Sequence, residues 1–249
     1  MTSLLLHKAG TFSCTYHALT GYGFDTDISS CQPAEYYRQE LDRLYDEIYH
    51  KSLSSTDADE RSHLLHILYS ELVDLFDEDT IRKVDDEALR LLPLLGATYP
   101  SLRLQLDICQ YAVHLPSAIR QRLISSLPGN ILQGMHHAPH PSETLFLMAS
   151  LAVEYLTEYG TTLDQSILSQ LEAAISDVHR LTCSAIDSES PVTPSNLYAI
   201  YNFLYMSDSG ATLQSRLASE ARRLITRYPE NTLEWWQCQH ILAIERLRV

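Results

Sequence analysis

Glycine is scarce in this sequence, with 8 among 249 residues, whereas average usage of about 7% would give roughly twice as many. Strand-and-turn proteins and nucleotide-binding loops need glycine where the backbone adopts positive φ. So little glycine favours helices joined by short turns. The motifs GxGxxG, GxxxxGK[ST] and GxSxG do not occur, which excludes the common dinucleotide-binding, P-loop and hydrolase-elbow classes.

Apolar residues recur at helical spacing from Pro33 onward. Pro33 suits a first helical position, and Thr56 or Asp57 can cap the next helix. At Thr193-Pro194 the two signals occur together, with Thr193 as the cap and Pro194 as the first helical residue. We therefore predict an all-α fold of antiparallel hairpins, stacked as an α–α superhelix or a repeat-like bundle. Further helices are expected near residues 101–114, 142–159, 163–187, 194–208, 211–228 and 231–247.

Residues 1–32 lack helical periodicity and are rich in Thr, Ser, Gly and Tyr. They predict an irregular or extended arm before a single helical domain over 33–249. The dipeptides Tyr-Pro at 99–100 and Cys-Gln at 109–110 recur 129 positions later, at 228–229 and 238–239. This repetition suggests two related halves, 33–115 and 142–249.

The segment EARRLITRYPENTLEWW resembles a tetratricopeptide repeat in its phrasing. The resemblance covers two short segments, around Pro100 and Pro229, and no period of roughly 34 residues is sustained. What the resemblance implies is physical: antiparallel helix pairs that must stack on their neighbours to bury their apolar faces.

The formal net charge of −14 is concentrated near the N-terminus. Residues 24–87 hold 18 acidic against 6 basic side chains, whereas residues 190–249 hold 5 against 6. A negative surface repels phosphate backbones, so no nucleic-acid partner is expected. A basic protein is the partner that this charge favours.

No apolar run approaches the roughly 20 residues of a membrane span, so no membrane partner is expected. The start of the chain, MTSLLLHKAG, lacks the basic region of a signal peptide. The five cysteines are scattered and odd in number, which fits free thiols in a reducing compartment. We therefore expect a cytoplasmic location, and no motif predicts a cofactor.

The segment 101–114 predicts a central helix, because apolar residues cover nearly its whole circumference. Its polar residues, Arg103, Asp107, Gln110 and His114, fall within about 60° of one another. This stripe faces either a cavity or solvent. In a cavity, Asp107 and His114 can exchange protons while Arg103 holds an anion. On a wet surface, Arg103 and Asp107 form an i,i+4 ion pair.

Histidines suggest a metal site in the segment GMHHAPHPSE, where His136, His137 and His140 lie close together. Flanking prolines favour an exposed loop instead. Glu60 and His63 match one half of a di-iron motif, but a second half is absent. His63 and His66 also lie opposite the leucine stripe, so we expect them to face away from the core. Cys14 and His17 are too weak a pattern for a catalytic pair.

Two groups of residues are candidates for partner binding. Tyrosines at helical spacing offer large, rigid contact area with a polar tip, although helix packing is the favoured explanation for them. Acidic residues near 77–86 either cap helices or dock a basic partner. The candidates are Tyr198, Tyr201, Tyr205, Asp77, Glu78, Asp79, Asp85 and Asp86.

These patterns favour a non-enzymatic interaction module, such as an adaptor, scaffold or inhibitor, that presents an acidic N-terminal face to a basic partner. The alternative is an all-helical enzyme or small-ligand binder whose site is the polar stripe at 103–114. The third hypothesis is a metal-binding protein that uses the histidine cluster at 136–140.

Overall fold

A computed structural model describes residues 2–20, 34–187, 193–207 and 211–247. Every regular element in these ranges is a helix, which confirms the predicted all-α fold. Of the helices in this part of the chain, none is both long enough and apolar enough to cross a lipid bilayer.

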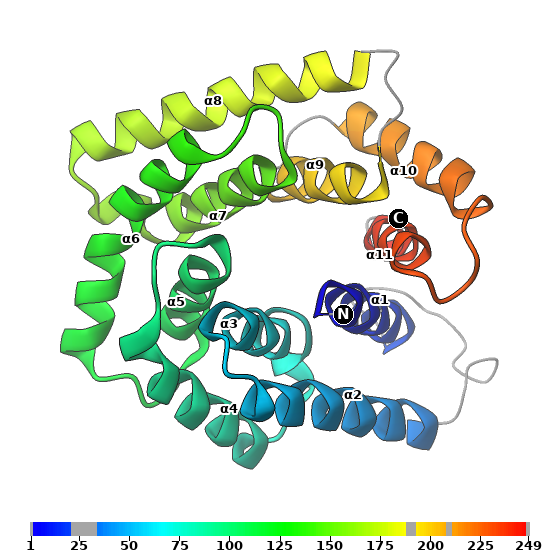
Figure 1. Cartoon of the computed structure of the whole chain (residues 1–249), viewed down its shortest axis with the longest axis horizontal. Coiled ribbons are helices and arrows are strands. Elements are labelled where there is room, and N and C mark those ends of the chain that lie inside the picture. The colour runs from blue at the N-terminus through cyan, green and yellow to red at the C-terminus, as the bar shows by residue number, and fades with distance from the viewer. Residues whose placement is uncertain (1, 21–33, 188–192, 208–210, 248–249) are drawn as a thin grey trace.

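The helices form two concentric layers, and the chain alternates between them (Figure 1). The inner helices are α1 (Thr2–Thr20), α3 (Ala58–Ile67), α5 (Tyr99–Tyr111), α7 (Glu143–Tyr159), α9 (Pro194–Met206) and α11 (Leu233–Leu247). The outer helices are α2 (Ala34–Ser54), α4 (Glu78–Leu91), α6 (Ser117–His137), α8 (Gln165–Asp187) and α10 (Ala211–Ile225). Short helical turns lie between some of them: η2 (Leu68–Leu72), η3 (Val73–Leu75), η4 (Leu92–Leu94) and η5 (Gly160–Thr162).

The inner helices close into a ring. Each packs on the next, from α1 through α3, α5, α7 and α9 to α11, and α11 packs extensively on α1. The first and last helices are therefore neighbours in space (Figure 1). The two ends of this row of inner helices meet, an arrangement that is compatible with the predicted stack of hairpins.

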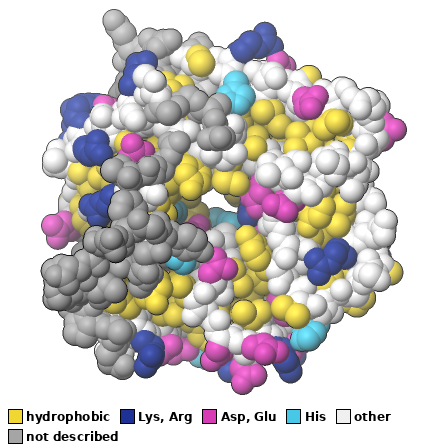
Figure 2. Space-filling view, turned by 180° about the vertical axis from the view of Figure 1, so that it is seen from behind, with side chains coloured by type: hydrophobic (Ala, Val, Ile, Leu, Met, Phe, Trp, Pro, Cys, Tyr) yellow, Lys and Arg dark blue, Asp and Glu magenta, His cyan; other side chains and the backbone are white. Residues whose placement is uncertain are grey.

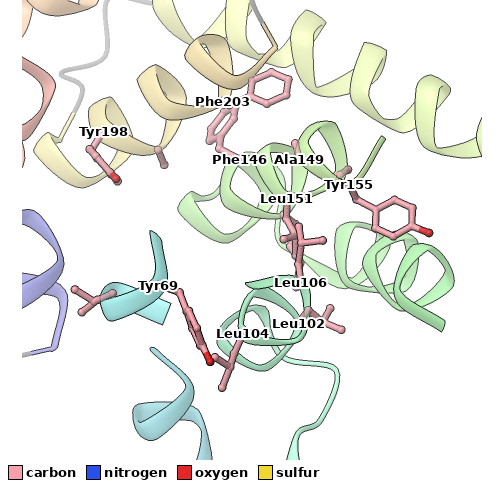
Figure 3. Close-up of a cluster of buried hydrophobic side chains, with 14 of the residues drawn as sticks. Tyr69, Leu102, Leu104, Leu106, Phe146, Ala149, Leu151, Tyr155, Tyr198 and Phe203 are labelled. Atoms are coloured by element: carbon pink, nitrogen blue, oxygen red, sulfur yellow. The ribbon is translucent and has the colours of Figure 1, made fainter. Parts of the chain in front are cut away.

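Helix α5 is deeply buried, as its sequence predicts. All nine residues from Ser101 to Cys109 are buried. Its leucines lie beside side chains of α7 in the core that Figure 3 shows. A helix that is apolar nearly all round needs neighbours on every side, and the two layers provide them.

Side-chain caps set several helix starts. Asp57 accepts hydrogen bonds from the amides of Asp59 and Glu60 at 2.8 and 3.3 Å. Thr193 caps α9 ahead of Pro194, as predicted. Such caps satisfy amides that have no partner inside the helix.

The expected irregular arm is wrong over residues 2–20, because they form helix α1. Leu5 and Ala9 are only 2% and 0% exposed between the neighbouring helices. Tertiary burial therefore outweighs the weak helix propensity of Thr, Ser and Gly. The rest of the predicted arm, residues 21–32, lies outside the described residues.

Four prolines and two glycines in residues 115–141 predict a short helix followed by an irregular connection, and the irregular part of this expectation is largely wrong. Helix α6 continues through Pro128 to His137. Proline removes one hydrogen bond from a helix interior. Leu127 and Ile131 are each 0% exposed on either side of it, and this burial offsets the loss.

Candidate functional site: a polar cavity inside the ring

A cavity of about 290 Å³ lies at the centre of the ring and is lined by side chains from all six inner helices. Figure 2 shows the molecule hollowed near its centre, with acidic and histidine side chains beside the hollow. Polar residues in the wall include His7, His63, Glu71, Arg103, Glu154, Tyr198 and His240. A core that served packing alone would not gather so many polar groups.

Arg103 is the centre of a buried ion-pair network. It is 8% exposed, and its guanidinium forms a two-pronged pair with Glu154, with one N–H···O contact of 2.9 Å. The same group donates to Asp107 Oδ1 at 2.8 Å. Burial by itself lowers the pKa of Arg103, but Asp107 and Glu154 raise it well above its ordinary value. Both carboxylates already use this cation, which leaves it poorly placed to hold an anionic ligand.

His66 joins the network through its ring nitrogens. Its Nδ1 lies 2.8 Å from Asp107 Oδ2 and 3.3 Å from Arg103 Nε. One nitrogen cannot donate to the carboxylate and accept from the guanidinium at once. The shorter, charge-assisted contact assigns the proton to Nδ1. The other ring nitrogen, Nε2, faces Ser70 Oγ at 3.5 Å.

Glu71 reaches the cavity from a π-helical turn, η2, that continues α3. Such turns re-aim side chains within a helix and recur at functional sites. Burial raises the pKa of Glu71 to about 7. The Ser70 hydroxyl approaches its Oε1 at 3.4 Å.

The contact between α1 and α11 is made by two facing histidines. His7 Nδ1 lies 3.3 Å from His240 Nδ1, and both rings pack against Tyr198. Gly10 makes this approach possible, because a Cβ there would lie 2.2 Å from two atoms of the His240 ring. Close packing of the two helices therefore requires glycine at this position.

The cavity histidines whose pKa is shifted are neutral at pH 7. Burial lowers the pKa of His63 and of His240 to about 3, and burial together with His240 lowers that of His7 well below its ordinary value. His63 Nε2 is buried and has no hydrogen-bond partner in the part of the chain that the structure describes. Burial also raises the pKa of Cys14, another wall residue, to about 12, so it is a thiol rather than a thiolate.

The residues of the predicted polar stripe do not share one site, because some lie at the central cavity and His114 lies outside it. Arg103 lines the central cavity, with Asp107 completely buried behind it. Gln110 is partly buried, and its Oε1 has no hydrogen-bond partner among the residues that the structure describes. His114 follows the end of α5, is exposed, and lines a shallow pocket beside α4. Helix α5 ends at Tyr111, short of the predicted end, so the helical spacing does not extend to His114.

The tyrosines at 198, 201 and 205 take different environments. Tyr198 and Tyr205 line the cavity. Tyr201 is 0% exposed and donates to Glu245 at 2.8 Å. Tyr201 is therefore not available to a partner.

Four of the five acidic candidates are exposed at the start of or along α4: Asp77, Glu78, Asp79 and Asp86. Asp77 caps the helix through the Thr80 amide, and hydrogen bonds with the Thr80 side chain and amide lower its pKa. Glu78 pairs with Arg82. Asp85 is 1% exposed and accepts bonds from the Tyr69 hydroxyl and the Val113 amide. This corrects the expectation that Asp85 contributes to an exposed acidic face. Neighbouring positions on α4 point to different sides, so Asp85 is buried although Asp86 is exposed.

The histidines at 136, 137 and 140 are exposed, and His137 bonds to the Gln133 carbonyl at 2.7 Å. The residues described contain no group of three His, Cys, Asp or Glu side chains arranged to hold a metal ion. The expectation that His63 and His66 face away from the core is wrong, because both line the cavity. Because the inner helices close into a ring, the side of α3 opposite its leucines faces the central cavity and not the outer surface.

Sequence reasoning missed most of the cavity wall. His7 and Cys14 lie in the segment interpreted as an arm, and Glu71 and His240 carried no recognised pattern. The only signals in the sequence were polar residues inside apolar helices, such as His240 within the buried stretch of α11.

Fold and site together define the class: an all-α protein whose closed ring of helices surrounds a polar cavity. None of the protein-family models, curated proteins or solved structures compared with this chain matches it.

Proposed function

We propose that this chain binds a small organic molecule in the cavity at the centre of the ring. The observation that carries the proposal is the convergence of polar side chains from separate helices on one cavity. Small-ligand sites combine an apolar wall with a few convergent polar groups. The cavity volume of about 290 Å³ suits a small metabolite.

The energetics of the wall support a ligand. A buried ion-pair network such as Arg103 with Asp107 and Glu154 contributes little net stability compared with an apolar core. His63 Nε2, which is buried without a hydrogen-bond partner within the described ranges, also costs free energy. Groups that reduce stability in this way are typical of binding sites.

A cavity-blocking variant tests the proposal. Ser150 lines the cavity and bonds to the Phe146 carbonyl at 3.0 Å. Ser125 makes the equivalent bond to Gln121 at 2.8 Å on the exposed side of α6. A fragment library of mixed charge is screened by NMR against the wild type, Ser150→Leu and Ser125→Leu.

We expect fragments that bind the wild type and Ser125→Leu but bind Ser150→Leu about tenfold more weakly or not at all, because leucine fills the binding space. Fragments that bind all three proteins equally would place the binding elsewhere and contradict the proposal. A complete absence of binding fragments would also contradict it.

A second candidate is a protein-interaction module that presents an acidic face. It is favoured by the exposure of Glu78, Asp79 and Asp86 on the outer helix α4. A basic partner would be recovered at low salt and lost at about 0.5 M salt, where exposed charges are screened. Asp79→Asn combined with Asp86→Asn should weaken that recovery. Equal recovery with the double variant would argue against this face.

A further inference from the structure

The cavity wall contains more negative than positive charge. Among the lining residues that the structure describes, Arg103 is the only Lys or Arg. Two carboxylates, Asp107 and Glu154, already bond to it. Glu71 and, nearer the rim, Glu143 add further acidic groups. The shifted histidines add no positive charge near neutral pH, because burial keeps them neutral.

Glu71 is an acidic wall residue without a cation among the described side chains. Within the described ranges, no basic side chain lies within ion-pair distance of it, and its side chain has one polar contact, the 3.4 Å approach of the Ser70 hydroxyl. Burial disfavours its charged form, which is why its pKa rises to about 7. A positive group beside Glu71 would remove this penalty.

His63 provides an independent sign of a missing partner. It lines the cavity, and its Nε2 atom is buried without a hydrogen-bond partner among the described residues. A neutral imidazole with its proton on Nδ1 presents Nε2 as an acceptor. A ligand with an N–H group would satisfy that atom, whereas a quaternary ammonium would not.

Aromatic rings complete the environment. Tyr99, Tyr198 and Tyr205 line the same cavity. Figure 3 shows Tyr198 extending from α9 toward the interior of the ring. The faces of aromatic rings attract cations, most strongly where water is excluded.

Two other ligand classes fit the wall less well. An anion would meet Glu71 and Glu154, and the nearby cation is already paired. A metal ion would need three suitable ligands together, and the part of the chain that the structure describes offers no such group.

From these contacts we infer that the cavity ligand is a small organic cation bearing N–H groups, such as a protonated amine or amidine. The inference rests on the proposed cavity function. Glu71 accepts the charged N–H group, His63 Nε2 accepts a second N–H, and the tyrosines pack on the carbon skeleton.

Calorimetric titration with matched probes tests the ligand class. The probes are benzylamine, benzyltrimethylammonium, benzyl alcohol and benzoate, which share one ring and differ in charge and N–H content. We expect benzylamine to bind at about pH 8 roughly tenfold more tightly than the alcohol, because the ammonium pairs with Glu71. The quaternary probe should be intermediate, and benzoate the weakest.

Two variants locate the recognition. Glu71→Gln should weaken benzylamine about tenfold and leave benzyl alcohol unchanged, since only the charge pair is lost. Glu78→Gln, which removes one exposed carboxylate from α4, should change neither. The affinity of the wild type for benzylamine should rise between about pH 6 and pH 8 as Glu71 ionises, and this rise should disappear in Glu71→Gln. His63→Phe provides a second variant that weakens the amine while Glu71 remains.

Tighter binding of benzyl alcohol or benzoate in the cavity would overturn the cation inference and leave the proposed small-ligand function standing. Benzylamine binding that Glu71→Gln and His63→Phe both leave intact would overturn it as well. If Ser150→Leu also fails to alter the binding of any probe or library fragment, the proposed function itself is contradicted.

Discussion

Replacing Gly10 with alanine should destabilise this protein, even though alanine is the better helix former. In a helix interior, alanine stabilises the helix by about 1 kcal/mol relative to glycine. At Gly10 the added Cβ would lie 2.2 Å from His240 Cε1 and Nε2 and 2.9 Å from Glu71 Oε2. Carbon atoms normally stay about 3.5–4.0 Å apart, so α1 and α11 would have to separate.

The His240 ring has little room to move, because His7 and Tyr198 pack against it. Overpacking of this kind costs typically about 1–3 kcal/mol, and a forced displacement of more than about 1 Å belongs at the upper end. After the helix-propensity gain is subtracted, we expect Gly10→Ala to lower the free energy of unfolding by about 2 kcal/mol.

Two other helical glycines serve as controls. A Cβ added at Gly129 in α6 would meet nothing within 4 Å, so Gly129→Ala should raise stability by up to about 1 kcal/mol. A Cβ at Gly134 would lie 2.7 Å from Met148 Cε. That atom is the end of a flexible side chain, so Gly134→Ala should change stability by less than about 1 kcal/mol.

Urea denaturation of the three variants gives the midpoint and slope that the comparison needs. A double-mutant cycle with His240→Ala assigns the cause. Once the ring is removed, Gly10→Ala should become neutral or stabilising, with a coupling energy above about 1 kcal/mol. The packing argument is refuted if Gly10→Ala behaves like Gly129→Ala, or if its cost is unchanged in the His240→Ala background.

Three further predictions concern buried polar groups. Arg103→Met should lower stability by about 3–5 kcal/mol in thermal or urea unfolding, because two buried carboxylates lose their cation; a loss below about 1 kcal/mol would contradict the network. His240 has a pKa of about 3 when folded, against about 6.5 unfolded. The unfolded state therefore binds the extra proton between these values, and wild-type stability should fall as pH drops below about 6.5. That fall should be steeper than in His240→Gln by about 1.4 kcal/mol per pH unit, and equal slopes would show that His240 is not buried as a neutral base. Asp85→Ala should cost about 2–3 kcal/mol, because it removes the acceptor for the Tyr69 hydroxyl and for a backbone amide. Asp86→Ala, one position along on the exposed side, should stay within about 0.5 kcal/mol in the same unfolding assay.

Local signals were sufficient for much of the helical layout. Predicted helices at 142–159, 163–187 and 194–208 agree closely with α7, α8 and α9. The Thr193-Pro194 cap and the central position of the helix at 101–114 were also predicted correctly. These features depend on residues within a few positions of one another, which is the range over which capping and amphipathic periodicity act.

Helix α1 shows where local signals fail. Its segment has weak helix propensity and no apolar stripe, and it is helical because α3 and α11 bury Leu5 and Ala9. Asp85 shows the same limit for charge, since its position in an acidic run predicts exposure but its partners, Tyr69 and Val113, bury it.

The sequence by itself determined that the chain is all-α, where most of its helices lie, and that the helix after Tyr99 is central. Only the tertiary structure decided that the row of inner helices closes, that α1 meets α11 at Gly10, and that His63, Glu71 and Arg103 share a cavity with His240. The physical reason is distance along the chain. Periodicity and caps act over a few residues, whereas ring closure and the cavity wall depend on packing between segments separated by most of the sequence.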